Sequence, residues 1–118
     1  PGRNRMLNLA VNSSNWPIQN TWSNRIHRDD AAAFIVFLIQ MLLDGQSVQD
    51  CYVVTDSRPV SQYEVLHWIA SQMGMEVGTE IPEIIGGKRM SNQRMLSTGF
   101  LLKYPDYKAG YSAMLKTA

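Results

Sequence analysis

The sequence predicts one mixed α/β (α+β) domain over residues 1–118, mostly helical with a few short strands. The apolar run AAAFIVFLIQMLL, residues 31–43, is typical of a helix in a soluble protein. Residues 60–74 have the capping-box spacing of Ser and Glu followed by an apolar helical face. The β-branched and aromatic run CYVVT, residues 51–55, predicts a buried strand. A chain of this length can bury about two-thirds of its unfolded surface, as one compact domain does.

The other elements of the N-terminal half follow from local pattern. Residues 4–12 have the apolar spacing of a short helix, and the Ser, Asn and Pro of residues 13–20 indicate a loop. Residues 21–28 contain β-formers, which predicts a short extended segment ending at an Asp pair. The helix that follows covers about residues 30–43 and stops at Gly45, which can adopt left-handed backbone geometry.

The C-terminal half alternates turns and helices. After a turn at residues 56–59 comes the helix at 60–74, which ends at a glycine. Residues 81–89 read as a loop or an edge strand, residues 91–99 as a short helix ended by Gly99, and residues 107–117 as an amphipathic helix. The apolar face of the helix at 60–74 is formed by Val65, Leu66, Trp68, Ile69 and Met73.

The helix at residues 31–43 raises two further expectations. Because it is apolar nearly all round, either it lies centrally in the domain or part of its cover is a domain outside this chain. Directly before it, Asp29 and Asp30 oppose the positive end of the helix dipole. We therefore expect one of these two carboxylates to cap the helix.

Composition excludes several classes of protein. Eleven Lys and Arg oppose ten Asp and Glu, a formal charge of +1 with no long run of like charge, so we expect no nucleic-acid partner. Cys51 is the only cysteine, which excludes an intrachain disulfide and favours a cytoplasmic location with an inert, buried thiol. The apolar run is short of the ~20 residues of a membrane span. The chain starts at Pro1, and we expect a fragment of a longer protein.

Four stretches together resemble the C-terminal part of extended and atypical short-chain dehydrogenase/reductases, the group with NAD-dependent sugar-nucleotide epimerases, dehydratases and related reductases. PGR at residues 1–3 is similar to the end of a Tyr-Gly-Pro-Gly-Arg loop. NRIHRDDAAAF at 24–34 resembles an Ile-His-x-x-Asp segment that leads into a helix. The strand, turn and helix at 52–70 resemble an Asp-x-x-Pro-Val-x-x-x-Glu pattern, and residues 87–111 resemble a closing Lys-Arg-x-Ser-Asn helix with a Tyr-Pro ending.

The resemblance implies the small C-terminal lobe of a Rossmann-type epimerase or reductase, without the Rossmann domain. It places Asn24, Arg25 and His27 where polar groups of a small-molecule substrate would arrive. Because a His before a helix is more often bonded to backbone than to a ligand, the structural role of His27 stays open as the alternative.

One position departs from the pattern of UDP-sugar epimerases. Where they commonly carry an arginine that holds phosphate, this chain has Ser23, and a hydroxyl cannot replace a guanidinium fork. Arg3, Arg25 or Arg89 could supply the charge from elsewhere. The chain is more similar to the reductase-like branch than to the nucleotide-sugar enzymes.

Cofactor chemistry is not expected in this chain. No Gly-rich turn with dinucleotide-binding spacing occurs, so we expect NAD or NADP only in the full-length parent. Tyr104 lies four residues before Lys108, the spacing of the family's acid/base pair, but Pro105 places the tyrosine outside the following helix. We therefore expect no catalytic residues. We also expect no metal site, because adjacent residues such as His27, Asp29 and Asp30 rarely converge on one ion.

These observations predict the substrate-binding lobe of an NAD(P)-dependent epimerase-like or reductase-like protein, not catalytic alone. Its expected partners are a small-molecule substrate and the parent's own Rossmann domain, with no membrane partner and with self-association through the uncovered helix. The alternative is an independent α/β protein-interaction module whose resemblance is incidental.

Overall fold

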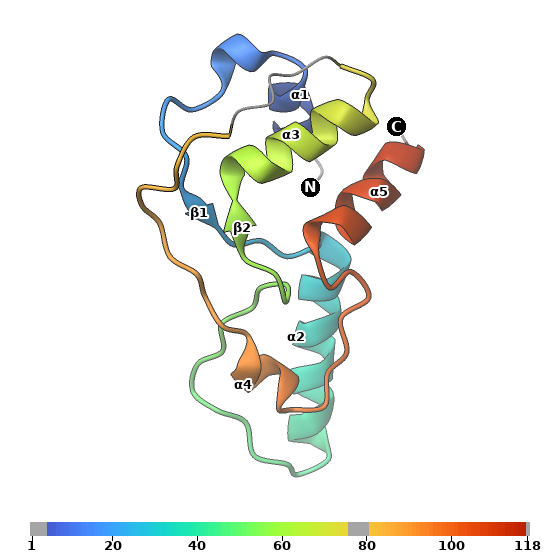
Figure 1. Cartoon of the computed structure of the whole chain (residues 1–118). Helices are drawn as coiled ribbons and strands as arrows, with labels where there is room; N and C mark the ends of the chain where they lie inside the picture. The colour runs from blue at the N-terminus through green and yellow to red at the C-terminus, as the bar shows by residue number, and fades with distance from the viewer. Residues whose placement is uncertain (1–4, 76–80, 118) are drawn as a thin grey trace. The chain divides into compact units, whose positions relative to one another are not determined.

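The computed structural model describes residues 5–75 and 81–117, and the chain divides into two compact units. Unit 1 comprises Pro1–Asn24 and Pro59–Arg89, and unit 2 comprises Arg25–Arg58 and Met90–Ala118. The elements of both are labelled in Figure 1. The expectation of one lobe over residues 1–118 stays a prediction.

Unit 1 is built from short elements around one longer helix. Its elements are α1 (Arg5–Ala10), the 3-10 helix η1 (Ser13–Asn15), β1 (Trp22–Ser23), β2 (Val60–Ser61) and α3 (Gln62–Gln72). The strands are antiparallel, with Trp22 opposite Ser61 and Ser23 opposite Val60. Residues 81–85 form a loop of this unit, in which Ile84 pairs with Asn20 through an isolated parallel bridge.

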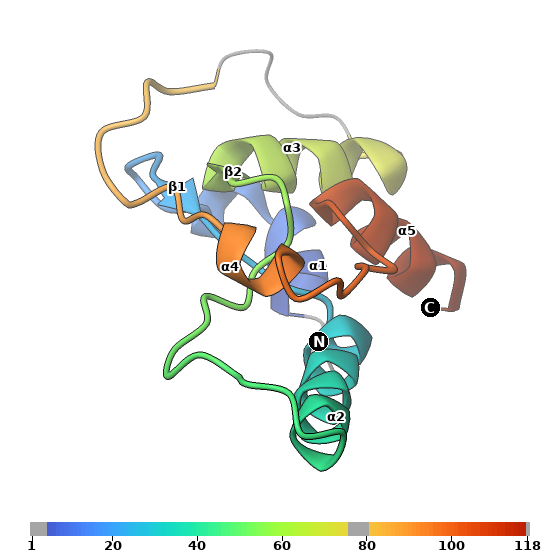
Figure 2. The same cartoon turned by 90° about the horizontal axis from the view of Figure 1, so that it is seen from below.

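The helix α3 confirms its predicted cap and stop, but not its whole apolar face, because Met73 is 41% exposed. The hydroxyl of Ser61 accepts the backbone N–H of Glu64 at 3.2 Å, which is the N-cap half of the predicted capping box. The helix ends at Gly74, whose φ of 74° is left-handed. Val65, Leu66 and Ile69 are fully buried, and α3 packs against α1, which lies beside it in Figure 2.

The side chain of Asn20 connects two segments of unit 1 by hydrogen bonds. It is completely buried, its side-chain oxygen accepts the backbone N–H of Tyr63 at 3.1 Å, and its amide donates to the carbonyl of Pro82 at 2.9 Å. A buried amide needs such partners, because without them it loses its hydrogen bonds to water and gains none from the protein. One side chain thus ties the first turn of α3 to the segment at residues 81–85.

Unit 2 has α2 (Arg28–Leu43) as its long helix, with α4 (Gln93–Leu96) and α5 (Tyr107–Thr117). The chain that follows α2 and the chain that follows α4 both run back along α2 (Figure 1). Between them lies a core centred on Phe34, Met95 and Phe100. The partly buried side chains packed on this core are Phe37, Leu38, Tyr52, Val54, Leu96 and Leu102.

The predicted strand at residues 51–55 is wrong. This segment belongs to no strand, although Tyr52 and Val54 do pack inward on the core. Its carbonyls accept from side chains instead of from a neighbouring strand: Asn92 donates to Thr55 at 3.1 Å and Arg94 to Cys51 at 3.3 Å. Cys51 is exposed and not buried as expected. The β-branched and aromatic composition of the segment is typical of residues that pack inward. A segment becomes a strand only when a second strand is available for backbone pairing.

The remaining helices are confirmed, and α2 shows an uncovered side. Gly45 and Gly99 follow α2 and α4 with φ of 76° and 93°, as predicted for helix ends. Five large apolar side chains of α2 are 52–76% exposed: Ile35, Val36, Ile39, Leu42 and Leu43. We call these five residues the α2 stripe. In residues 5–75 and 81–117, no helix has the length and hydrophobicity that crossing a membrane requires.

Candidate functional site

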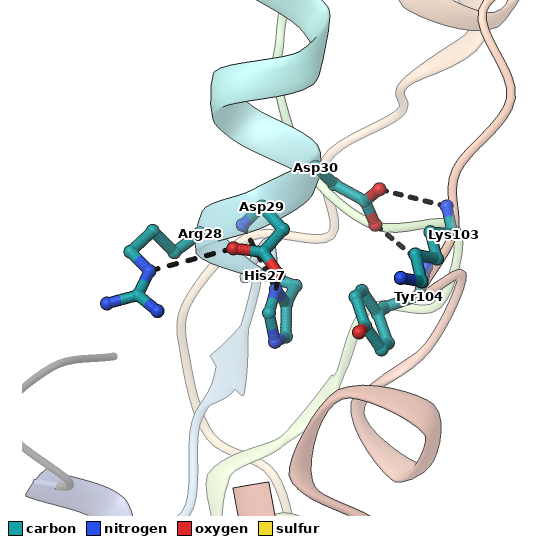
Figure 3. A network of polar contacts seen from close by, with 6 residues as sticks. All are labelled: His27, Arg28, Asp29, Asp30, Lys103 and Tyr104. Carbon is teal, nitrogen blue, oxygen red and sulfur yellow. Dashed lines mark hydrogen bonds and ion pairs between the residues drawn. The ribbon is translucent and has the colours of Figure 1, made fainter. Parts of the chain in front are cut away.

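The segment ahead of α2 corrects the prediction that an aspartate caps this helix. The N-cap is His27, whose Nδ1 accepts the backbone N–H of Asp29 at 3.0 Å (Figure 3). Asp29 is exposed in the first turn, with its carboxylate 3.9 Å from His27 Nδ1 and 3.7 Å from Arg28 Nε. The sequence pattern located the helix start, but an imidazole nitrogen can accept the same hydrogen bond as a carboxylate.

Asp30 has a different role from a cap. It is buried, and its two oxygens accept the backbone N–H groups of Lys103 at 2.9 Å and Tyr104 at 2.8 Å (Figure 3). The carboxylate therefore fixes the segment ahead of α5 against the first turn of α2. This contact joins positions far apart in the sequence, so local pattern could not reveal it.

His27 is held on two sides. Its ring stacks on Tyr104 with centroids 3.9 Å apart, and its side chain is only 11% exposed. Gly110 of α5 also lies against the ring, since a Cβ there would be 3.5 Å from His27 Cδ2. Because Nδ1 serves the helix cap, Nε2 is the ring nitrogen left to meet a ligand. The structure thus shows the backbone-bonded role that the sequence left open.

Tyr104 and Lys108 do not form the spaced pair that the sequence offered. Tyr104 precedes α5, which begins at Tyr107, as the following proline predicted. Its ring stacks on His27, and the ammonium group of Lys108 lies 6.0 Å over the ring of Tyr107 instead. The four-residue spacing is therefore not a turn of one helix here.

Arg25 lies in a polar cluster of unit 2 with Asp56 and Tyr111. Its carbonyl accepts the backbone N–H of Asp56 at 2.6 Å, and its guanidinium donates to the phenol of Tyr111. Burial raises the pKa of Tyr111, which the guanidinium partly opposes. Arg25 thus connects the segment ahead of α2 to α5.

Asp56 is the titratable group that sequence reasoning missed. Burial raises its pKa to about 6, against the lowering effects of the Arg58 backbone N–H and the Arg25 guanidinium. The carboxylate of Asp106 adds a smaller raising effect. Desolvation therefore outweighs the hydrogen bond and the nearby cation, which places the pKa of this carboxyl at about 6.

Asn24 and Arg89 lie in unit 1, around Trp22. The Asn24 amide donates to the carbonyl of Lys88 at 2.5 Å, and the Arg89 guanidinium lies 4.8 Å over the Trp22 ring. Trp22 also donates its backbone N–H to Gly86 at 2.8 Å. Two of the predicted residues are thus brought to one strand, and Trp22 joins them as a residue that the sequence did not predict for the site.

The structure therefore groups the candidates in two places. Asn24 and Arg89 share the surroundings of β1, whereas Arg25 and His27 lie on the segment that enters α2. Arg3 lies outside the described residues. Among the described residues, no group of three or more His, Cys, Asp or Glu side chains is arranged to hold a metal ion.

Comparison with known proteins identifies a solved structure that is similar to the chain. The chain superposes with a TM-score of 0.94 and 42% sequence identity on a protein of Methylobacillus flagellatus described as a "putative NAD-dependent epimerase/dehydratase". The chain is thus similar to part of a protein described as an epimerase/dehydratase. The match covers 99% of this chain and 43% of the Methylobacillus protein, so the chain spans less than half of that relative. The resemblance and the mostly helical mixed fold predicted from the sequence are confirmed.

Neither a scan of protein-family models nor a search of curated proteins found a match to the chain.

Proposed function

We propose that this chain is the C-terminal, substrate-binding lobe of an NAD(P)-dependent epimerase-like or reductase-like protein. The observation that carries the proposal is the 42% identity over 99% of the chain to a protein described as NAD-dependent, of which the chain spans 43%. In this proposal the remainder of the parent is a Rossmann-type domain that binds NAD or NADP and carries out the hydride chemistry. The lobe contributes substrate contacts.

The α2 stripe supports a neighbouring domain as one partner of the lobe. Soluble proteins rarely leave contiguous apolar surface of this kind uncovered. Five large side chains are each more than half exposed, and Ile39 lies three or four residues from each of the other four, so all five share one side of the helix. A Rossmann-type domain packed on this side would remove them from water, at roughly 25 cal/mol per Å² of apolar surface.

The substrate contacts proposed for the lobe come from its polar side chains near β1 and α2. Asn24 and Arg89 offer an amide and a guanidinium beside Trp22. His27 offers Nε2, since Nδ1 caps α2. Arg25 offers a guanidinium next to Asp56 and Tyr111, and Arg3 is a further candidate. Donors of this kind suit a small carbonyl or hydroxyl substrate.

Calorimetric titration with NADH and NADPH tests this proposal. The 118-residue chain alone should show no specific binding, whereas the product of the complete reading frame should bind one of the two nucleotides. Specific micromolar binding to the short chain would contradict the proposal that a separate domain of the parent binds the nucleotide. A complete product that lacks nucleotide binding would instead favour an independent interaction module, for which the α2 stripe would be the contact surface.

A further inference from the structure

The segment Gly86–Arg89 is fastened along β1 at a distance that glycine alone permits. Trp22 donates to Gly86 at 2.8 Å, and Asn24 donates to Lys88 at 2.5 Å. Between these bonds, Gly87 has a φ of 86°, and a Cβ there would lie 2.5 Å from the backbone oxygen of Trp22. The sequence GGKR therefore delivers two basic side chains to a defined place beside β1.

Arg89 is positioned there by its contact with Trp22. The guanidinium carbon is 4.8 Å from the centroid of the Trp22 ring, which is within cation–π range. A guanidinium is a planar fork that can bind two oxygens of a carboxylate or phosphate at once, and contact with an aromatic ring is compatible with that use. Among the described carboxylates, none forms an ion pair with Arg89. Lys88 and Arg89 are both exposed.

Ser23 does not compete for this role. Its hydroxyl donates to the carbonyl of Val60 at 2.8 Å and so supports the pairing of β1 with β2. The positive charge near β1 in the described residues therefore comes from the GGKR segment and not from the strand itself. A preorganised guanidinium loses less conformational entropy on binding than a free surface arginine.

We propose that Trp22, Lys88 and Arg89 form a binding corner for an anionic group of the substrate, a carboxylate or a phosphate. Arg89 supplies the bidentate fork, Trp22 holds it in place, and Lys88 adds a second positive charge. This inference rests on the proposed function, because it names the chemical class of the substrate that the lobe receives. It also assigns a task to Gly87, because the missing Cβ lets the segment that carries Lys88 and Arg89 approach Trp22.

Proton–nitrogen correlation spectra of the 118-residue chain, recorded at low ionic strength during titration with inorganic phosphate or acetate, test the corner. The indole N–H of Trp22 should shift in a saturable way with at least one of the two anions. Phosphate alone would identify a phosphate-bearing substrate, and acetate alone a carboxylate. Arg89→Gln should weaken the binding at least tenfold, and Arg89→Lys should weaken it less.

Arg28→Gln is the matched control, because Arg28 is an exposed arginine at the start of α2. It should leave the Trp22 titration unchanged. No saturable shift with either anion, or equal weakening by Arg28→Gln and Arg89→Gln, would overturn the proposal. The titration uses no nucleotide cofactor, so its failure is distinguishable from failure of the calorimetric experiment above.

Discussion

The carboxylate of Asp30 accepts the backbone N–H of Tyr104 at 2.8 Å, across a separation of 74 residues. The same carboxylate accepts from Lys103, so the start of α2 and the approach to α5 meet at one buried charge. The hydrogen bonds place Tyr104 where its ring stacks on His27. The position of His27, a candidate substrate-binding residue, thus depends on the buried carboxylate of Asp30.

Replacing Asp30 should therefore destabilise the fold far more than replacing its neighbour. Asp30→Ala leaves two backbone donors without an acceptor and should lower the free energy of unfolding by about 2–4 kcal/mol. Asp29→Ala removes only an exposed charge from the first turn and should cost under about 1 kcal/mol. Urea denaturation of the two variants measures the difference. Similar losses for both would show that Asp30 is not the tie described above.

The cap by His27 predicts which substitutions α2 tolerates. His27→Ala removes the acceptor for the Asp29 N–H and should cost about 0.5–2 kcal/mol, whereas Asn is a favoured cap residue that should restore that part of the loss. Helical circular dichroism during thermal unfolding reports the effect. An alanine variant as stable as the parent, or an asparagine variant no better than alanine, would contradict the assigned cap.

Burial of Asp56 predicts a stability that falls as pH rises. Its folded-state pKa of about 6 lies above the ordinary value of 3.8, so between these values the folded state binds more protons than the unfolded state. Stability should therefore decline from about pH 4 to about pH 6, by at most about 3 kcal/mol for a shift of this size. The Arg25 guanidinium and the Asp106 carboxylate are the charged groups that modulate this pKa, and the backbone N–H of Arg58 lowers it by a hydrogen bond.

Asp56→Asn isolates this contribution, since the amide oxygen can still accept the backbone N–H of Arg58. The variant should lose the decline between pH 4 and pH 6 in urea titrations at fixed ionic strength. A pH profile parallel to that of the parent would assign the dependence to other groups.

Two glycines with similar dihedral angles should respond differently to alanine. Gly45 and Gly87 have φ of 76° and 86°, so each substitution carries left-handed strain of about 1–2 kcal/mol. Only at Gly87 does the new Cβ also meet backbone, at 2.5 Å from the Trp22 oxygen, whereas no atom lies within 4 Å at Gly45. Gly87→Ala should cost clearly more and should shift the Trp22 indole resonance. Equal losses of unfolding free energy for the two variants would mean that the segment around Gly87 moves away from Trp22 at no measurable cost.

The α2 stripe predicts self-association of the isolated chain. Val36 and Leu43 are 65% and 76% exposed, and burying them against a second copy removes apolar surface from water. Sedimentation equilibrium should show oligomers that Val36→Lys with Leu43→Lys abolishes, while Gln93→Lys on the exposed side of α4 leaves them intact. A monomer at every accessible concentration would remove the stripe as a contact surface.

Several features could be read from local sequence because their causes are local. The capping spacing of Ser61 and Glu64 predicted the start of α3, and Gly45, Gly74 and Gly99 predicted helix ends, since only a few residues determine each. Resemblance in four short stretches predicted the epimerase/dehydratase-like relationship. Composition also identified α2 as a helix that is apolar nearly all round.

Tertiary structure decided the questions in which one residue has several available partners. A His and two Asp residues lie at the start of α2. Only the stacking of Tyr104 on His27 and the backbone N–H groups of Lys103 and Tyr104 assign the cap to His27 and the buried contact to Asp30. The CYVVT run had the composition of a strand but found side chains of α4 and its N-cap in place of a paired strand. Arg89 meets Trp22 because Gly87 lets two distant segments touch. Local sequence determined which elements could form, whereas contacts across many residues decided their partners, because a hydrogen bond or stack depends on proximity in space and not along the chain.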